Sequence, residues 1–157
     1  MKKIIFTSFC LSMLMAQTAF SSTTLGKINL QTVDGENSHV LSASKVEDQV
    51  LYDGGVPYNT KVIVSPRVTV NGSKYTIGIG GDVEEYICNK FFNKKYSRAA
   101  RGDIFIWNNL YAYYNITKLS TNLFLANEEN DFDGMGGSQT PIIDRIFCAD
   151  QEINIGE

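Results

Sequence analysis

The sequence is poor in the residues and motifs by which most enzymes are recognised. It contains one histidine, His39, and three cysteines. It has no Ser/His/Asp signature, no zinc-type spacing of histidines or cysteines, and no phosphate-binding glycine loop followed by lysine. These absences remove the sequence basis for the enzyme classes that such motifs identify. The sequence still allows a hydrolase that uses paired carboxylates, because 17 acidic residues permit many pairs.

An excess of basic charge and a second long apolar run are also missing. The chain carries 14 Lys and Arg against 17 Asp and Glu, a net charge of −3. Nucleic-acid-binding domains are usually basic, so no nucleic-acid partner is expected. No run beyond the N-terminus approaches the roughly 20 apolar residues of a transmembrane helix. The protein is therefore expected not to span a membrane once its N-terminal segment is removed.

The N-terminal segment has the pattern of a secretory signal. Lys2 and Lys3 precede the apolar stretch Ile4–Met15, and small residues follow where a signal peptidase cleaves. The short basic start favours a bacterial source, and the expected location is the periplasm or the outside of the cell. The predicted division is a signal peptide at residues 1–21 and a single exported domain at residues 22–157.

Cysteine usage fits this division. Cys10 lies in the apolar part of the signal and should leave with it, which leaves Cys88 and Cys148. Two thiols in an oxidising compartment are expected to form a disulfide. The alternative is a nucleophilic Cys88 assisted by His39, although no orienting partner is recognisable around either residue.

Most of the exported segment has the pattern of strands and hairpins. The dipeptide Asn71-Gly72 between two alternating runs predicts a type I′ hairpin, because both turn positions need positive φ. The resulting register places Val68, Val70, Tyr75 and Ile77 on one face. Further strands are predicted at 25–33, 61–65, 104–107, 110–116, 122–126 and 142–148, residues 40–51 are ambiguous, and loops are predicted at 53–57 and 127–137.

One main helix is predicted, at about residues 83–93. Asp82 and Glu85 have the spacing of an N-cap and its capping-box partner. Val83, Tyr86, Ile87 and Phe91 follow at helical spacing. The fold class is therefore α+β: a strand-rich single domain with β-hairpins and one main helix tied to a C-terminal strand by the Cys88–Cys148 disulfide.

The main candidate binding site is a basic segment at residues 90–101. It concentrates five cations and a tyrosine in an otherwise acidic chain, and such a segment can contact a phosphate, a sulfated glycan, an anionic lipid or an acidic protein. The alternative is neutralisation within the fold, because residues 128–157 carry eight acids against one base. The candidate residues are Lys90, Lys94, Lys95, Tyr96, Arg98 and Arg101.

Three shorter features are candidates of lesser weight. Arg101-Gly102-Asp103 spells the integrin-recognition tripeptide in a region expected to be a loop. Asp131 and Asp133 precede a glycine as in a calcium loop, but Thr140 occupies the place of the bidentate glutamate, so a surface loop is favoured. An aromatic group that could stack on sugars or belong to the core comprises Trp107, Tyr111, Tyr113 and Tyr114.

One family resemblance rests on two segments. Glu85-Tyr-Ile-Cys-Asn-Lys-Phe91 places a cysteine in a short helix, and Ile142-Ile-Asp-Arg-Ile-Phe-Cys148 is followed by Ala-Asp-Gln-Glu152. In this the chain resembles scavenger-receptor cysteine-rich domains, which have a helical cysteine and a late strand that ends in cysteine before an acidic residue. The resemblance implies a secreted domain that binds proteins or polyanions. It transfers no binding residue to this chain.

The features together predict a small exported binding domain without a cofactor. Its basic segment at 90–101 is expected to contact an anionic or glycan-bearing surface. The alternatives are a hydrolase or inhibitor that works in the envelope or outside the cell, for which two close carboxylates in a pocket would be the sign, and a structural component of the envelope.

Overall fold

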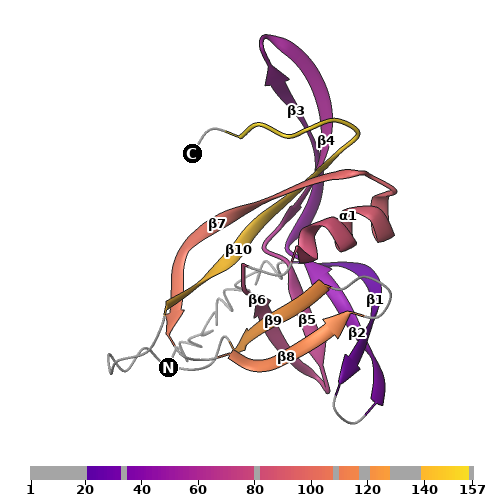
Figure 1. The fold of residues 1–157 in the computed structure, drawn as a ribbon, viewed down its shortest axis with the longest axis vertical. Helices are drawn as coiled ribbons and strands as arrows, with labels where there is room; N and C mark the ends of the chain where they lie inside the picture. The colour runs from indigo at the N-terminus through magenta and orange to yellow at the C-terminus, as the bar shows by residue number, and fades with distance from the viewer. Residues whose placement is uncertain are drawn as a thin grey trace, which may run out of the picture.

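The computed structural model describes residues 21–32, 35–79, 82–107, 110–116, 121–127 and 139–155. Within these ranges the chain forms one helix and ten strands, and the strands are arranged in two antiparallel sheets (Figure 1). The predicted signal and the loop at 127–137 fall almost entirely outside the described residues. The elements are β1 (Thr23–Thr32), β2 (Gly35–Ala43), β3 (Lys45–Asp53), β4 (Val56–Val64), β5 (Arg67–Val70), β6 (Ser73–Ile77), α1 (Val83–Phe92), β7 (Tyr96–Trp107), β8 (Leu110–Ile116), β9 (Thr121–Asn127) and β10 (Gln139–Ala149).

The first sheet is a closed barrel of six strands in the order β1-β2-β5-β6-β9-β8. It closes where β1 pairs with β8, with Leu30 opposite Ile116. Alternating residues of its strands point inward, as the two-residue period of a strand requires. The fully buried side chains inside it include Ile28, Leu41, Val68, Ile77, Leu123 and Leu125.

The hairpin predicted at Asn71-Gly72 is confirmed in its register. Val70 pairs with Ser73 and Val68 with Tyr75, and Asn71 and Gly72 have φ of 49° and 85°. Both values are positive, as a two-residue connection of this kind requires. The local signal was sufficient here because turn geometry alone sets the pairing.

The second sheet is open and has the strand order β3-β4-β10-β7. One face packs on α1 and the barrel through residues such as Ile63 and Ile146. The other face carries Tyr58, Val62 and Phe147, which pack against Ile153 of the C-terminal segment. The β3–β4 hairpin projects past the rest of the molecule, and the C-terminal segment runs beside it (Figure 1).

Helix α1 lies between the two sheets (Figure 1). It spans Val83–Phe92, within one residue of the prediction, and buries Val83, Tyr86, Ile87 and Cys88. The predicted disulfide is present: Cys88 bonds to Cys148 of β10, with the two Cα atoms 5.3 Å apart. Cys88 is therefore not a free nucleophile, which rules out the alternative that paired it with His39.

The predicted capping box is wrong. Asp82 has φ 54° and ψ 33°, in the left-handed region, and its side chain makes no cap hydrogen bond. A side-chain N-cap needs extended backbone angles to bring its oxygen to the first free N–H groups. The carbonyl of Asp82 accepts a 3.2 Å hydrogen bond from the Glu85 N–H instead.

Tertiary pairing resolves one ambiguous segment and corrects two expectations. Residues 40–51, ambiguous in sequence, form parts of β2 and β3. The loop expected at 53–57 is a tight turn at Gly54-Gly55, because Asp53 pairs with Val56 and Tyr52 with Pro57. The Arg101-Gly102-Asp103 triplet is part of strand β7 and not a loop, since β7 pairs with β10 from Tyr96 to Trp107.

Candidate functional site

The basic segment runs from the last turn of α1, through a short connection, into β7. Lys90 belongs to the last helical turn, where a cation is favoured by the helix dipole. Asn93 ends the helix in the left-handed conformation, and Lys94 donates its N–H to the Cys88 carbonyl at 3.1 Å. The chain then reverses into β7, an edge strand of the open sheet.

Strand geometry divides the two arginines between opposite faces of the sheet. Arg98 is opposite Phe147, which belongs to the apolar cluster beside the C-terminal segment. Arg101 is opposite Ile143, which belongs to the core on the side of the barrel. Residues directly opposite in a sheet point to the same face, so the two arginines diverge. The structure thus does not gather all five cations on one surface, because a register shift in β10 intervenes.

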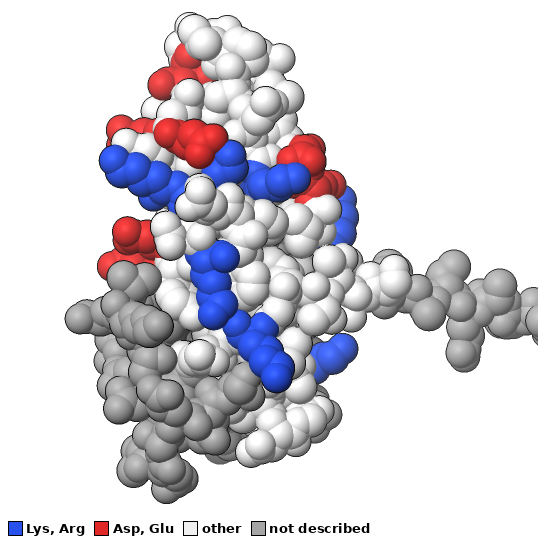
Figure 2. Space-filling model, turned by 90° about the vertical axis from the view of Figure 1, so that its right-hand side faces the viewer, with Lys and Arg blue, Asp and Glu red and all other residues white. Residues whose placement is uncertain are grey.

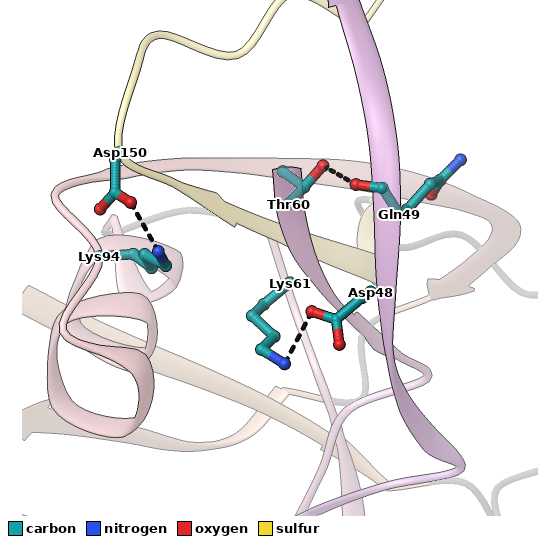
Figure 3. Close-up of polar contacts among 6 residues, drawn as sticks. All are labelled: Asp48, Gln49, Thr60, Lys61, Lys94 and Asp150. Atoms are coloured by element: carbon teal, nitrogen blue, oxygen red, sulfur yellow. Dashed lines mark hydrogen bonds and ion pairs between the residues drawn. The ribbon is translucent and has the colours of Figure 1, made fainter. Parts of the chain in front are cut away.

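Lys94 is neutralised within the fold. Its Nζ lies 2.7 Å from Oδ2 of Asp150, and the two side chains point toward each other from the ends of α1 and β10 (Figure 3). The Lys94 side chain is 26% exposed, whereas that of Asp150 is 76% exposed. The neutralisation expected from the acidic C-terminal region is therefore realised at Lys94, and among the described residues at no other cation of the segment.

Lys90 and Lys95 lie over aromatic rings. The Nζ of Lys90 is 5.7 Å from the ring centroid of Tyr86 and 6.0 Å from that of Phe91, and the Nζ of Lys95 is 5.5 Å from that of Tyr96. Such contacts hold an ammonium in place while it stays hydrated and available. Both lysines are exposed, and within the described part of the chain neither has a carboxylate partner. They are the positions of the segment best arranged to meet an external anion.

A further cation, Lys27 of β1, was missed in sequence because it lies far from the segment along the chain. Its neighbour Gly26 lies so close to α1 that a Cβ there would be 3.0 Å from the Phe91 ring. Lys27 is exposed and, among the described residues, has no ion pair. Figure 2 shows a continuous band of lysine and arginine atoms with no acidic atoms beside it, below a second group of cations that lies among carboxylates.

Ion pairs neutralise several cations of the described residues. Besides Lys94, Lys61 pairs with Asp48 at 2.7 Å (Figure 3), and Lys45 pairs with Glu47 at 2.7 Å. These pairs lie on the β3–β4 hairpin. Exposed pairs contribute little to stability, but each removes the local excess of positive charge.

Apolar exposure is concentrated on the same hairpin. Val50 is 49% exposed, Tyr52 66% and Val56 64%. All three lie at the projecting end of β3 and β4, on either side of the Gly54-Gly55 turn. No periodicity in the sequence distinguished these residues from core positions, because their exposure depends on how far the hairpin extends beyond the barrel.

One acidic group on α1 has a shifted pKa. Burial of Glu84 in the first helical turn raises the pKa of its carboxyl above the ordinary value of 4.5; a backbone hydrogen bond opposes this shift, and the charges of Asp82 and Glu85 reinforce it.

The remaining candidates lie outside the described side chains. Asp131 and Asp133 are in the 128–138 stretch, which the structure does not describe. The backbone of Trp107 belongs to β7 and those of Tyr111, Tyr113 and Tyr114 to β8, but their side chains are not described. The assignment of these aromatic residues to core or surface stays a prediction.

Comparison of the chain with protein-family models, with curated proteins and with solved structures finds no match. The likeness of residues 85–152 to scavenger-receptor cysteine-rich domains therefore stays a prediction. Among the described residues, no helix is both long and apolar enough to cross a membrane.

Proposed function

We propose that the protein is an exported binding protein that contacts an anionic, glycan-bearing surface. The observation that carries the proposal is the pair Lys90 and Lys95. Both are exposed, both lie over aromatic rings, and neither is paired with a carboxylate in the described part of the chain. Export as one domain is supported by the N-terminal signal pattern and by the Cys88–Cys148 disulfide, which oxidising compartments favour.

The chemistry of the site favours sulfate or phosphate groups carried on a sugar-rich surface. Lysine is a point charge suited to such groups, and the half-buried Tyr96 ring beside Lys95 can offer an apolar edge to a sugar, whereas Tyr86 beside Lys90 is buried. Lys27 and Arg98 are also exposed and without ion pairs among the described residues, so they are further cations available to an external anion. Lys94 is not part of this surface, because Asp150 occupies it.

The net charge of the chain predicts how binding should depend on salt. The chain is acidic overall, so binding to an anionic surface must depend on local cations rather than on global attraction. Contacts between exposed charges are screened by salt, with a Debye length near 10 Å at about 0.1 M. Retention on a polyanion should therefore fall steeply as salt is added.

The test is retention on immobilised heparin, used as a sulfated-polysaccharide probe, over a salt gradient. The variant Lys90→Gln/Lys95→Gln should elute at clearly lower salt, with an affinity reduced about fivefold to tenfold at low ionic strength. The matched control is Lys61→Gln/Lys74→Gln, which removes the same charge from the β3–β4 hairpin and from the start of β6. The control should elute with the parent protein.

Two results would contradict the proposal. Equal losses in both variants would mean that only the total charge matters. No retention of the parent protein on heparin, together with none on vesicles that contain anionic lipid, would leave the exposed lysines as an ordinary solvated surface.

A further inference from the structure

Strand β3 is a regular, unbulged edge of the open sheet. It is the first strand in the order β3-β4-β10-β7, and its nine residues pair with β4 without any register shift. An edge strand exposes alternate N–H and C=O groups that can pair with another strand. The opposite edge, β7, is different, because two register shifts interrupt its pairing with β10. Bulges are one usual protection of an edge, and β3 has none.

The exposed apolar side chains lie along this same edge. Val46, Val50 and Tyr52 share one face of β3, because strand residues alternate. Val50 is 49% exposed and Tyr52 66%. The charged residues of the strand are Lys45, Glu47, Asp48 and Asp53. Leu51, on the other face, packs against the cluster that contains Ile153, but in the described part of the chain no strand pairs with the outer edge of β3. A regular, unpaired edge with exposed apolar side chains is suited to a partner strand.

We propose that the partner is a second copy of this chain, added to β3 in antiparallel orientation about a two-fold axis at Gln49. Such an interface is isologous, so each contact occurs twice. In this register Gln49 faces its own counterpart and Val46 faces the second copy's Tyr52, an aromatic and β-branched pair that stabilises sheets. The two open sheets then become one continuous sheet of eight strands.

Charge complementarity selects this register. It places Lys45 opposite the second copy's Asp53 at both ends of the interface. Sliding one copy by two residues in one direction brings Asp48 opposite itself, and sliding it in the other brings Glu47 opposite Asp53. Like charges directly opposite in a sheet are destabilising. A slide by one residue is excluded because it turns every side chain to the wrong face.

The charged groups of the interface are already oriented. Asn154 donates a hydrogen bond to Oδ1 of Asp53 at 3.4 Å, which leaves the second carboxylate oxygen for a lysine. Asp48 is neutralised by Lys61 at 2.7 Å, so it can lie opposite Val50 without an unpaired charge. Lys45 contacts Glu47 at 2.7 Å, and in the dimer it would lie between that carboxylate and the second copy's Asp53.

The association should depend on concentration. Nine residues per copy form the strand pair, whereas a stable interface uses roughly 20–30 residues on each side. Sedimentation velocity of the purified protein over a wide concentration range should show a monomer–dimer equilibrium. Lys45→Glu should raise the dissociation constant by about tenfold or more, because two attractive pairs become repulsive.

The reciprocal variant makes the test specific for the register. Lys45→Glu/Asp53→Lys exchanges the two charges and should restore dimerisation, whereas Lys74→Glu, an equal charge change on the barrel, should leave it unaltered. A protein that stays monomeric at every concentration overturns the proposal, as does a dimer that is indifferent to Lys45→Glu. The first of these results is also the one expected if β3 receives a strand from a different protein.

Cross-linking gives a second, independent readout. Gln49→Cys places a thiol against its own counterpart on the two-fold axis, and mild oxidation should link the two copies. Ser44→Cys, just before β3, is the matched control and should not form the link. The parent protein is oxidised alongside, so that any link through Cys10 is recognised. Failure of Gln49→Cys to link a protein that does dimerise shows that the interface lies elsewhere.

Discussion

The barrel and the open sheet differ in how they cover the edges and faces of their strands. In the barrel every strand has two neighbours, so no backbone edge is left and the side chains pack inward around Ile28 and Leu125. The open sheet keeps two edges, β3 and β7, and depends on a helix, a disulfide and the C-terminal segment to cover its faces. Of the two candidate surfaces, the β3 edge belongs to the open sheet, whereas Lys90 and Lys95 lie on α1 and on the connection into β7. The comparison predicts that stability is concentrated in the barrel, and that recognition is concentrated in the open sheet and the helix beside it.

The largest expected effect is in the barrel core. Ile28→Ala removes a fully buried side chain from a closed structure that cannot collapse around the cavity, and it should cost about 3–5 kcal/mol of unfolding free energy. Ile153→Ala, in the cluster on the outer face of the sheet, should cost about 1–2 kcal/mol because the terminal segment can move inward. Chemical denaturation of both variants measures the difference. Equal losses would mean that the two regions are equally rigid.

The next largest effect is expected from removal of the disulfide that joins the helix to the open sheet. Cys88→Ala/Cys148→Ala removes a bridge between residues 60 positions apart and should cost about 2–4 kcal/mol. Hydrogen exchange should then show faster opening of α1 and β10, with β1 and β2 keeping their protection. Uniformly faster exchange in the barrel would show that the two sheets unfold as one unit.

The smallest effect concerns Glu84 of the helix between the two sheets. Burial raises the pKa of its carboxyl, so the folded state favours the protonated form. The stability linked to this group is complete below its unfolded pKa and is lost as the pH rises through the folded pKa. Glu84 is only partly buried, so solvent screens its charge. Glu84→Gln should therefore stabilise the protein at neutral pH by well under about 1 kcal/mol, and the gain should vanish in acid.

Thermal denaturation from acid to neutral pH measures this gain, with the exposed neighbour Glu85→Gln as the control for loss of one charge. A stabilisation by Glu84→Gln that is the same at every pH would contradict the assignment to carboxyl burial.

Local patterns predicted much of the fold. Turn chemistry predicted the Asn71-Gly72 hairpin and its register, and helical spacing predicted the helix near residues 83–93. Sequence patterns also predicted most of the strands, and the even number of cysteines after the signal predicted the disulfide. Each of these depends on residues close in sequence or on a count. The capping box failed because Asp82 adopts a left-handed backbone, which the entry of the chain into the helix imposes.

Less of the candidate site could be predicted from the sequence. The basic segment was identified by composition, but nothing in its order shows that Lys94 meets Asp150, 56 positions away, or that Arg98 and Arg101 point to opposite faces. Lys27 and the exposed edge of β3 carry no local signal at all. Their roles depend on which strands become neighbours and which are left at an edge.

The sequence by itself thus predicted the Asn71-Gly72 turn, the main helix and the disulfide, all of which the structure contains. The compartment expected from the signal pattern stays a prediction. Only the tertiary structure decided how the strands divide between a closed barrel and an open sheet, which lysines are neutralised and which edge stays open. The physical reason is range: dihedral preferences and side-chain period act over a few residues. Strand pairing, burial and ion pairing join residues that only the folded chain brings together.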